Sequence, residues 1–451
     1  MTAARRASPL TREAIALVEV GQTSVRPWLA RTMVGGFLLV LVLLPVAEWL
    51  GERAAGERAS NPLWRLSAIG PDIRSRVEAA GGEASTWSRV VAANRAVLAG
   101  LTAFEADLED GSAVASVLRP PTQLVLSGAL GAGNERVYVG RDGWLFFRPD
   151  VEYVTGPGFL EPRVLARRIA SADEYAVPPS PDPRPAILAF ARDLASRGIS
   201  LVVVPTPVKP TVHSAGLSRR FDGSRDPVQN ASFEAWVEAL RTGGVRVFDP
   251  APLLTAWRAD SGVAQYLATD THWRPEAAAA VALALAEYIR REVALPSLPA
   301  AGYRAVRRQA TSRGDTLVSL DLPSWQVRYP QETVPLQHVV DGVGEPWRPV
   351  RQADVLLLGD SFANIYSLAT MGWGEAAGLT EHLALALQRP VDRIVQNDAG
   401  ARATRDLLVR ELTASRAARE GADRLTGKRV VVWQFATREL AFGDWAVLPL
   451  P

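Results

Sequence analysis

The feature that most constrains the fold is the alternation of short apolar runs with helix-like segments from residue 187 onward. Apolar runs bounded by polar or glycine positions are typical of strands that are covered on both faces. The expected strands are 200–204, 245–248, 355–358, 394–395 and 430–433, and the expected helices are 187–196, 233–242, 275–293, 379–388 and 404–415. This alternation predicts an α/β fold with a mostly parallel sheet and flanking crossover helices.

Two regions depart from this alternation. Residues 303–349 contain several prolines and short alternating runs, which predict an irregular, partly β insertion. Residues 51–121 are rich in Ala, Arg and Glu, and their apolar spacing predicts a helical stalk or packing arm. Because proline breaks a helix interior, we expect this arm to end at Pro120-Pro121.

The segment after the arm is predicted to begin a catalytic domain over residues 122–451. Short strands are expected at 124–126 and 137–139. The second strand is followed by Asp142-Gly143 and an aromatic run, which predicts a β-hairpin with Asp-Gly at its turn.

Charge and composition exclude several functional classes. The chain has 451 residues, with 50 Lys and Arg against 48 Asp and Glu, so a net charge of +2 gives no indication of nucleic-acid binding. Zero cysteines exclude disulfides, thiolate metal sites and a cysteine nucleophile. The histidines, which leave few candidates for a general base, are His213, His272, His338 and His382.

The N-terminal region carries a membrane signal. Residues 1–32 hold five arginines against two glutamates and precede an apolar run that Trp28 and Trp49 flank. A helix of roughly 20 residues spans about 30 Å, which matches the hydrocarbon core. We therefore expect a cytoplasmic basic terminus, a transmembrane anchor at 33–50 and a catalytic domain outside the inner membrane. A cleaved signal peptide is the alternative.

The run 355–358 stops at Gly359-Asp360 and is followed by Ser361. The carboxyl edge of an open α/β sheet is where ligands bind, and a tight turn there exposes a hydroxyl beside backbone N–H groups. Ser361 is therefore a candidate nucleophile, with Asp360 interpreted as a turn residue. The alternative is an ordinary Ser or Asp helix cap.

A base and an orienting acid are available in Asp270-Thr271-His272-Trp273. This segment lies between an apparent strand at 266–267 and a helix that begins near Pro275, so it should lie near the sheet edge. A carboxylate on Nδ1 would fix the tautomer and leave Nε2 to accept the proton of a serine hydroxyl. A helix-capping loop with a surface histidine remains possible, and a metal site would need more converging ligands.

Six motifs occur in order over about residues 137–440: 139–146 (VGRDGWLF), 201–207 (LVVVPTP), 269–273 (TDTHW), 314–317 (GDTL), 358–362 (LGDSF) and 433–440 (WQFATREL). In these motifs the sequence resembles the SGNH-type polysaccharide O-acetyltransferases of the alginate biosynthesis AlgJ and AlgX kind. The Asp-x-His motif precedes the serine, an order permuted relative to ordinary GDSL hydrolases. That order also disfavours an α/β-hydrolase, because only His382 follows Ser361 and packing explains it better.

The resemblance implies a triad of Ser361 as nucleophile, His272 as general base and acid, and Asp270 as the orienting residue. It implies an O-acetyltransferase exposed to the periplasm, which acetylates an exopolysaccharide with acetyl groups from an integral-membrane acyltransferase. We expect no cofactor, and no metal because the sequence lacks a pair of ligands at metal-binding spacing. Two alternatives stay open, a carbohydrate esterase with the same triad and a noncatalytic scaffold of a secretion complex.

The oxyanion hole is less well indicated by the sequence. The backbone N–H of Ser361 is the first candidate, since a hole needs donors at the nucleophile. Substrate or oxyanion candidates near the same edge are Asn364, Tyr366, Gly400, Arg402 and, after the second motif, Lys209.

Overall fold

The computed structural model describes residues 26–54, 70–71, 74, 86–110, 113–171, 178–397, 400–418 and 421–451. It divides into two compact units, Met1–Pro120 and Pro121–Pro451. The first unit contains α2 (Pro27–Ala54) and α5 (Thr86–Asp110). The predicted basic terminus, apart from residues 26–32, and much of the predicted stalk lie outside the described residues.

The predicted transmembrane anchor at 33–50 is not supported. The segment is helical, as part of α2. Within the described part of the chain, however, no helix combines the length and the apolar character that crossing a membrane requires.

A second correction concerns the proline pair. Helix α6 (Ala113–Ala129) continues through Pro120-Pro121, so the strand predicted at 124–126 is wrong. The residues around the pair are mostly Ala, Val and Leu, and the hydrogen bond from Leu130 N to Leu126 O continues the helical pattern beyond it. A proline removes one donor and limits its neighbour, but flanking turns can keep a helix intact where the residues around it favour one.

The second unit is built on a five-stranded sheet of order β4-β3-β9-β7-β8, in which every pairing is parallel. The strands are β3 (Ser200–Thr206), β4 (Arg246–Val247), β7 (Val355–Gly359), β8 (Asp392–Val395) and β9 (Val430–Ala436). All five coincide with predicted strands, which confirms the α/β fold with a mostly parallel sheet.

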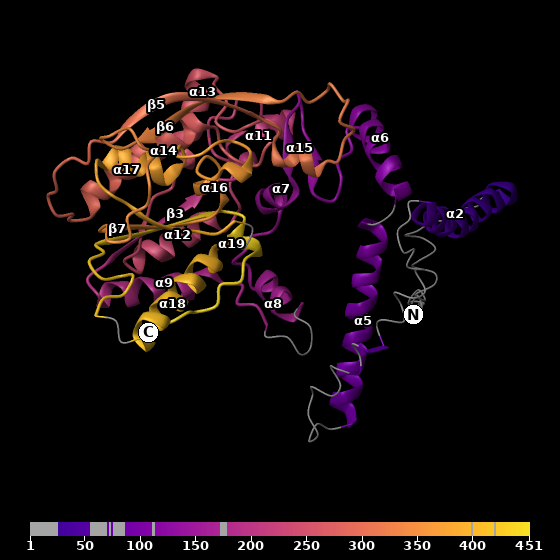
Figure 1. Ribbon diagram of the computed structural model, residues 1–451, viewed down its shortest axis with the longest axis horizontal. Helices are drawn as coiled ribbons and strands as arrows, with labels where there is room; N and C mark the ends of the chain where they lie inside the picture. The colour runs from indigo at the N-terminus through magenta and orange to yellow at the C-terminus, as the bar shows by residue number, and fades with distance from the viewer. Residues whose placement is uncertain are drawn as a thin grey trace, which may run out of the picture. The chain divides into compact units, whose positions relative to one another are not determined.

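Each face of the sheet carries its own hydrophobic core. Along β3, Val202 and Val204 belong to one core and Leu201 and Val203 to the other, as the two-residue period of a strand requires. Helices α14 (Pro275–Glu292) and α17 (Leu379–Leu387) cover the first face. Helices α9 (Pro183–Ser196), α12 (Phe233–Thr242) and α18 (Gly400–Ala417) cover the second (Figure 1). Coverage on both faces explains why the strands are continuously apolar.

The predicted insertion is more regular than expected. Strands β5 (Arg304–Ser312) and β6 (Glu332–Val340) pair antiparallel along their whole length and form a ribbon. The ribbon lies beyond α14 and α17 in Figure 1. Its connection contains α15 (Asp315–Ser319), which contacts the loop that carries Asp270 and His272.

The predicted hairpin is confirmed. Strands β1 (Val137–Val139) and β2 (Leu145–Phe147) pair antiparallel. Asp142 and Gly143 have φ angles of 51° and 83°, the left-handed pair that an Asp-Gly hairpin turn adopts.

The remaining described elements are short helices and turns of 3-10 helix around the sheet. They are α7 (Arg148–Thr155), α8 (Pro162–Ala170), α10 (Lys209–Val212), α11 (Ser214–Leu217), η1 (Arg219–Phe221), α13 (Ala251–Ser261), α16 (Ser361–Asn364), η2 (Ala369–Met371) and α19 (Glu439–Phe442).

Candidate active site

Ser361 lies where β7 ends and α16 begins, at the carboxyl edge of the sheet, as predicted. The cap of α16 is Asp360, whose Oδ1 accepts a hydrogen bond from Phe362 N at 2.9 Å. Its Oδ2 accepts one from Ala436 N at 2.7 Å, and Gln434 Nε2 donates to Oδ1 at 2.9 Å. Asp360 therefore does more than form a turn: it caps α16 and ties β7 to β9. The Ser361 hydroxyl is left free for another partner.

That partner is His272. Its Nε2 lies 2.9 Å from Ser361 Oγ, and its Nδ1 lies 2.7 Å from Asp270 Oδ1. The same carboxylate oxygen accepts a hydrogen bond from His272 N at 3.0 Å. All three side chains are buried, with 6% or less of each residue exposed. The structure thus brings Ser361 together with Asp270 and His272, whose motif lies far from it in the sequence.

The loop that carries Asp270 and His272 is closed on itself. Tyr266 and Trp273 form an isolated antiparallel bridge, and Leu267 N donates to His272 O at 3.1 Å. The predicted strand at 266–267 is therefore wrong, because these residues pair within their own loop rather than with the sheet. Glu332, at the start of β6, accepts hydrogen bonds from Ala268 N at 3.1 Å and Thr269 N at 2.9 Å.

Two further donors hold the second oxygen of Asp270. Trp373 Nε1 donates to Oδ2 at 2.9 Å, and Asp315 N donates to it at 3.0 Å. Hydrogen bonds of this kind favour the ionised carboxylate. Trp373 and Glu332 were not predicted, because neither lies in a recognisable motif.

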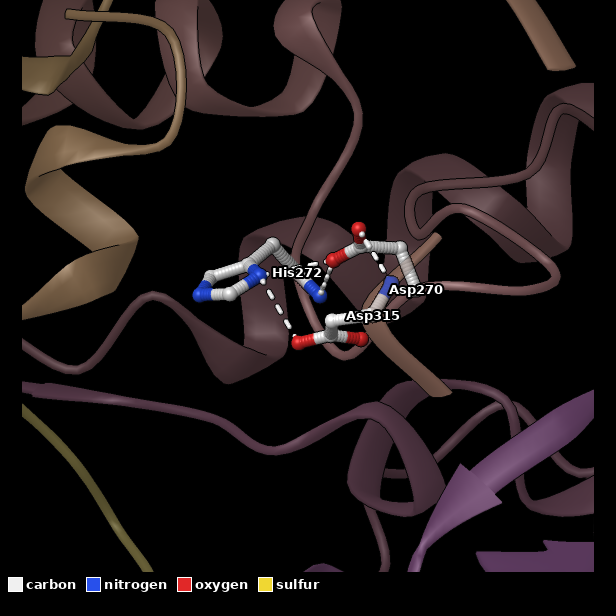
Figure 2. A group of neighbouring side chains, drawn as sticks. All are labelled: Asp270, His272 and Asp315. Carbon is white, nitrogen blue, oxygen red and sulfur yellow. Dashed lines mark hydrogen bonds and ion pairs between the residues drawn. The ribbon is translucent and has the colours of Figure 1, made fainter. Parts of the chain in front are cut away.

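Asp315 brings a second carboxylate to the same imidazole. Its Oδ1 accepts hydrogen bonds from Thr271 N at 2.6 Å and Thr271 Oγ1 at 3.0 Å. Its Oδ2 lies 3.6 Å from His272 Nδ1, so both acids approach one ring nitrogen (Figure 2). The Gly314-Asp315 motif was part of the predicted resemblance, but no role followed from it.

The electrostatics follow from these contacts. Burial opposes ionisation of Asp270, but the hydrogen bonds and charge of His272 outweigh burial and lower the pKa of Asp270 to about 2. Burial also opposes protonation of His272, but the hydrogen bond and charge of Asp270 outweigh it, so the pKa of His272 is raised. Desolvation and the neighbouring Asp270 raise the pKa of Asp315 to about 6, although solvent screens this effect because its side chain is 45% exposed.

Asp270, His272 and Asp315 also have the residue types of a metal site. Potential ligand atoms of Asp270, His272 and Asp315 lie within 4.8 Å of one another. Yet His272 Nδ1 and Asp270 Oδ1 face each other at 2.7 Å, closer than the roughly 3.3 Å between two ligands of a tetrahedral zinc ion. The other oxygen of Asp270 accepts N–H groups. The arrangement therefore fits a hydrogen-bonded acid–base pair better than a metal site.

Two of the predicted oxyanion or substrate candidates, Tyr366 and Asn364, form hydrogen bonds with other parts of the chain. Tyr366 is fully buried, and its hydroxyl donates to Trp273 O at 2.7 Å, which anchors the residue after His272. Asn364 Nδ2 donates to Asn397 Oδ1 at 3.2 Å and so links α16 to the segment after β8.

Gly400 and Arg402 have partners away from the triad. Gly400 begins α18 with a φ of 68°, and a Cβ there would lie 2.6 Å from Glu439 Oε2. Arg402 forms ion pairs with Asp406 and Asp444. Within the described chain, neither forms a hydrogen bond or ion pair with Ser361, His272 or Asp270.

Lys209 and His382 are both buried. Lys209 Nζ donates to Leu145 O at 2.5 Å and Ala268 O at 3.2 Å, so it joins the hairpin to the loop of His272 rather than pointing to an oxyanion. Burial lowers the pKa of Lys209 to about 8. His382 lies inside α17, in agreement with the packing role predicted for it.

Comparison with known protein families finds a match over most of the second unit. Residues 137–437 match the family described as the SGNH hydrolase-like domain, acetyltransferase AlgX. This range covers the site, both hydrophobic faces of the sheet and the insertion. The match confirms the predicted resemblance and the predicted class of domain, an acetyltransferase of the SGNH type.

The individual relatives share low sequence identity with this chain. The chain is 28% identical over 192 residues to the probable alginate O-acetylase AlgJ of Pseudomonas aeruginosa, and this alignment covers 42% of each protein, less than half the length of that relative. The O-acetyltransferase domain of Pseudomonas putida AlgJ is 19% identical, with a TM-score of 0.46 over 68% of this chain and 92% of that one. Pseudomonas aeruginosa AlgX is also 19% identical, with a TM-score of 0.44 over 67% of this chain and 61% of that one.

Proposed function

Because the chain belongs to the family of SGNH hydrolase-like domains of the AlgX acetyltransferase kind, we propose that it transfers acetyl groups to hydroxyls of an exopolysaccharide. The observation that supports this proposal most is the continuous contact from Ser361 Oγ through His272 to Asp270. A serine hydroxyl is a weak nucleophile at neutral pH, and an adjacent imidazole oriented by a carboxylate supplies the activation it needs.

The first half of the reaction acylates the enzyme. Ser361 Oγ attacks the acetyl carbonyl of the donor while its proton passes to His272 Nε2, and Asp270 stays ionised opposite the imidazolium. His272 then gives this proton to the leaving group of the donor. The product is an acetyl ester on Ser361.

The second half returns the enzyme to its starting state. A sugar hydroxyl loses its proton to His272 Nε2 and attacks the acetyl ester, and the same proton then returns to Ser361 Oγ. Both tetrahedral intermediates need N–H donors for their oxyanion, and the backbone N–H of Ser361 stays the predicted donor.

The acceptor, donor and location are proposed at the level that the family allows. The acceptor is an exopolysaccharide, and an integral-membrane acyltransferase supplies the acetyl groups on the periplasmic side. The absence of cysteine suits that location. A carbohydrate esterase would use the same triad with water as the acceptor, so the fate of the acetyl group decides between the two activities.

The test uses the full chain with p-nitrophenyl acetate as donor and alginate oligosaccharides as the first acceptors. Mass spectrometry should find acetylated oligosaccharide and an acetyl group on Ser361. In Ser361→Ala the adduct should disappear and the transfer rate should fall by about 10³-fold or more, since the nucleophile is lost. Free acetate without acetylated sugar would favour the esterase.

A matched control is Ser367→Ala. Ser367 follows the same short helix, but its hydroxyl bonds to Glu381 Oε2 at 2.7 Å instead of to His272. Its activity should stay within a few-fold of the wild type. If Ser361→Ala remained as active as Ser367→Ala, the assignment of Ser361 as nucleophile would be rejected. A wild-type chain that formed neither acetylated sugar nor free acetate would favour a noncatalytic scaffold.

A further inference from the structure

Asp315 contacts the loop that carries Asp270 and His272, called the triad loop below, without belonging to it. Its main-chain N–H donates to Asp270 Oδ2, and its carboxylate accepts both the N–H and the hydroxyl of Thr271. Thr271 is the residue between Asp270 and His272, so Asp315 holds the middle of the loop in which these two side chains face each other. The mechanism above uses neither oxygen of Asp315.

The remaining oxygen of Asp315 faces the imidazole. Its Oδ2 lies 3.6 Å from His272 Nδ1, beyond a good hydrogen bond but close enough for a strong charge interaction. Figure 2 shows the two carboxylates approaching this nitrogen from different segments of the chain. The Asp270 side chain is 1% exposed, whereas the Asp315 side chain is 45% exposed. Asp270 is therefore buried, and Asp315 is accessible to solvent.

We propose that Asp315 is a second acidic positioning residue of the site, which fixes the Thr271 peptide and supplies a second negative charge to the imidazolium of His272. This inference rests on the proposed function, in which His272 takes up a proton in both half-reactions. Asp270 orients the ring and contributes most to its protonation, and the charge of Asp315 adds to that effect.

Other charged groups near His272 also favour or oppose its protonation, and the effect of Asp315 has to be compared with theirs. Asp270 lies on the same loop, and Arg438, which precedes α19, opposes protonation of His272. Arg438 is itself paired with buried Asp150 of α7 at 2.9 Å. Lys209 of α10 interacts electrostatically with both Asp270 and Asp315. Asp270 and Asp315 thus favour protonation of His272 and Arg438 opposes it, while buried Asp150, which also interacts with His272, is paired with Arg438. Removing Asp315 would shift this balance toward positive charge.

The sign of the expected shift follows. A nearby negative charge stabilises the imidazolium, so it raises the pKa of His272. In Asp315→Asn the amide oxygen can still accept the hydrogen bond from Thr271 N, but the charge is gone. We expect the midpoint of His272 protonation to fall by roughly one pH unit, the lower end of the range for an adjacent charge because Asp315 is partly exposed.

The direct test is a titration of the full chain with isotope-labelled histidine, followed by NMR of the ring nitrogens, with His272→Gln to assign the signal. Burial lowers the pKa of His213 to about 3 and that of His382 to about 4, which separates them from His272. An unchanged His272 midpoint in Asp315→Asn would overturn the proposal. This readout needs no activity, so a failure of the proposed function would show separately, as an inactive wild type.

A kinetic test adds a second readout. The acid limb of kcat/KM for hydrolysis of p-nitrophenyl acetate should move to lower pH by the same amount in Asp315→Asn. Asp315→Ala also loses the Thr271 contact, so its kcat should fall by a further ~10-fold or more. Equal losses in both variants with no movement of the limb would reduce Asp315 to a structural role and contradict the proposal.

Asp321→Asn is the matched control. Asp321 follows α15 in the same insertion, is exposed and has a φ of 54°, a conformation that asparagine tolerates. The substitution Asp321→Asn removes one acidic charge from a residue that does not contact the triad loop. Both the His272 midpoint and the acid limb should stay at their wild-type values; a shift as large as that of Asp315→Asn would assign the effect to net charge and sink the proposal.

Discussion

Ser361 owes its free hydroxyl to its neighbour. A serine at the start of a helix normally competes for the capping role, since its oxygen can accept a backbone N–H. Asp360 fills that role with one oxygen and binds β9 with the other. The hydroxyl of Ser361 can then lie 2.9 Å from His272 Nε2.

The substitution Trp373→Phe tests one hydrogen bond to Asp270, the one that the indole N–H of Trp373 donates. The change keeps a buried aromatic ring but removes the N–H that donates to Asp270 Oδ2 at 2.9 Å. A hydrogen bond to a charged group contributes about 1.5–3 kcal/mol, so kcat/KM should fall roughly 10- to 100-fold at neutral pH. Steady-state kinetics with p-nitrophenyl acetate measure this loss.

Trp236→Phe is the control for that experiment. Trp236 is also fully buried, in the core on the opposite face, and its indole nitrogen has no hydrogen-bond partner among the described residues. The same chemical change there should affect stability slightly and kcat/KM by less than a few-fold. Equal kinetic losses in both variants would show that ring size, not the Asp270 contact, matters at Trp373.

The insertion at 303–349 contacts the loop of Asp270 and His272 through both its ribbon and its connecting helix. Its ribbon places Glu332 against Ala268 and Thr269, and its connecting helix α15 places Asp315 against Thr271. The triad loop is thus held from outside the sheet, although it forms no strand of its own. The approach is close, because Gly314 packs directly on the loop backbone.

Gly314→Ala tests that approach. A Cβ at Gly314 would lie 2.0 Å from Thr269 O and 2.5 Å from Asp270 N, so α15 or the loop must move. We expect a loss of about 1–3 kcal/mol in the free energy of unfolding. A displacement near 1 Å at the triad should also lower kcat about 100-fold. Urea denaturation and kinetics measure the two effects.

Gly342→Ala is the matched control in the same insertion, because a Cβ there meets nothing within 4 Å. Stability and activity should both stay close to wild type. If Gly314→Ala behaved like Gly342→Ala, the insertion would not brace the triad loop as described.

The second unit as a whole should lose stability in mild acid through its buried histidines. Burial lowers the pKa of His382 to about 4, and its Nε2 has no partner in the described structure. Its folded-state pKa lies below the ordinary value near 6.5, so between these values the unfolded chain binds more protons. Its contribution to stability is therefore complete above about pH 6.5 and is lost as the pH falls toward 4.

The substitution His382→Leu should remove this pH-dependent contribution to the free energy of unfolding. Between pH 7 and pH 5 the wild type should lose about 2 kcal/mol more unfolding free energy than the variant. Urea denaturation followed by tryptophan fluorescence at both pH values gives the difference. Parallel curves for the two proteins would mean that His382 is protonated to the same extent in the folded and unfolded chains.

The amino-acid sequence by itself determined the sheet and the candidate triad. Apolar runs bounded by polar or glycine positions, alternating with helix-like segments, favour strands covered on both faces, so all five strands of the sheet were predictable. Ser361, Asp270 and His272 were predictable because their chemistry is specific and their motifs resemble one family. The errors fell where local signals were weak or overruled: the proline pair inside α6 and the residues 266–267 that pair within their loop. The transmembrane anchor predicted at 33–50 is helical but not supported as a membrane span among the described residues.

The tertiary structure alone decided what surrounds the triad. Trp373, Glu332 and Asp315 reach the loop of His272 from distant segments, and no local pattern marks a side chain whose partner lies far along the chain. It also decided which neighbour caps α16, because Asp360 and Ser361 are equally suited as caps by sequence. Local propensity and periodicity are properties of adjacent residues, whereas the protonation and orientation of His272 depend on charges and donors that only folding brings together.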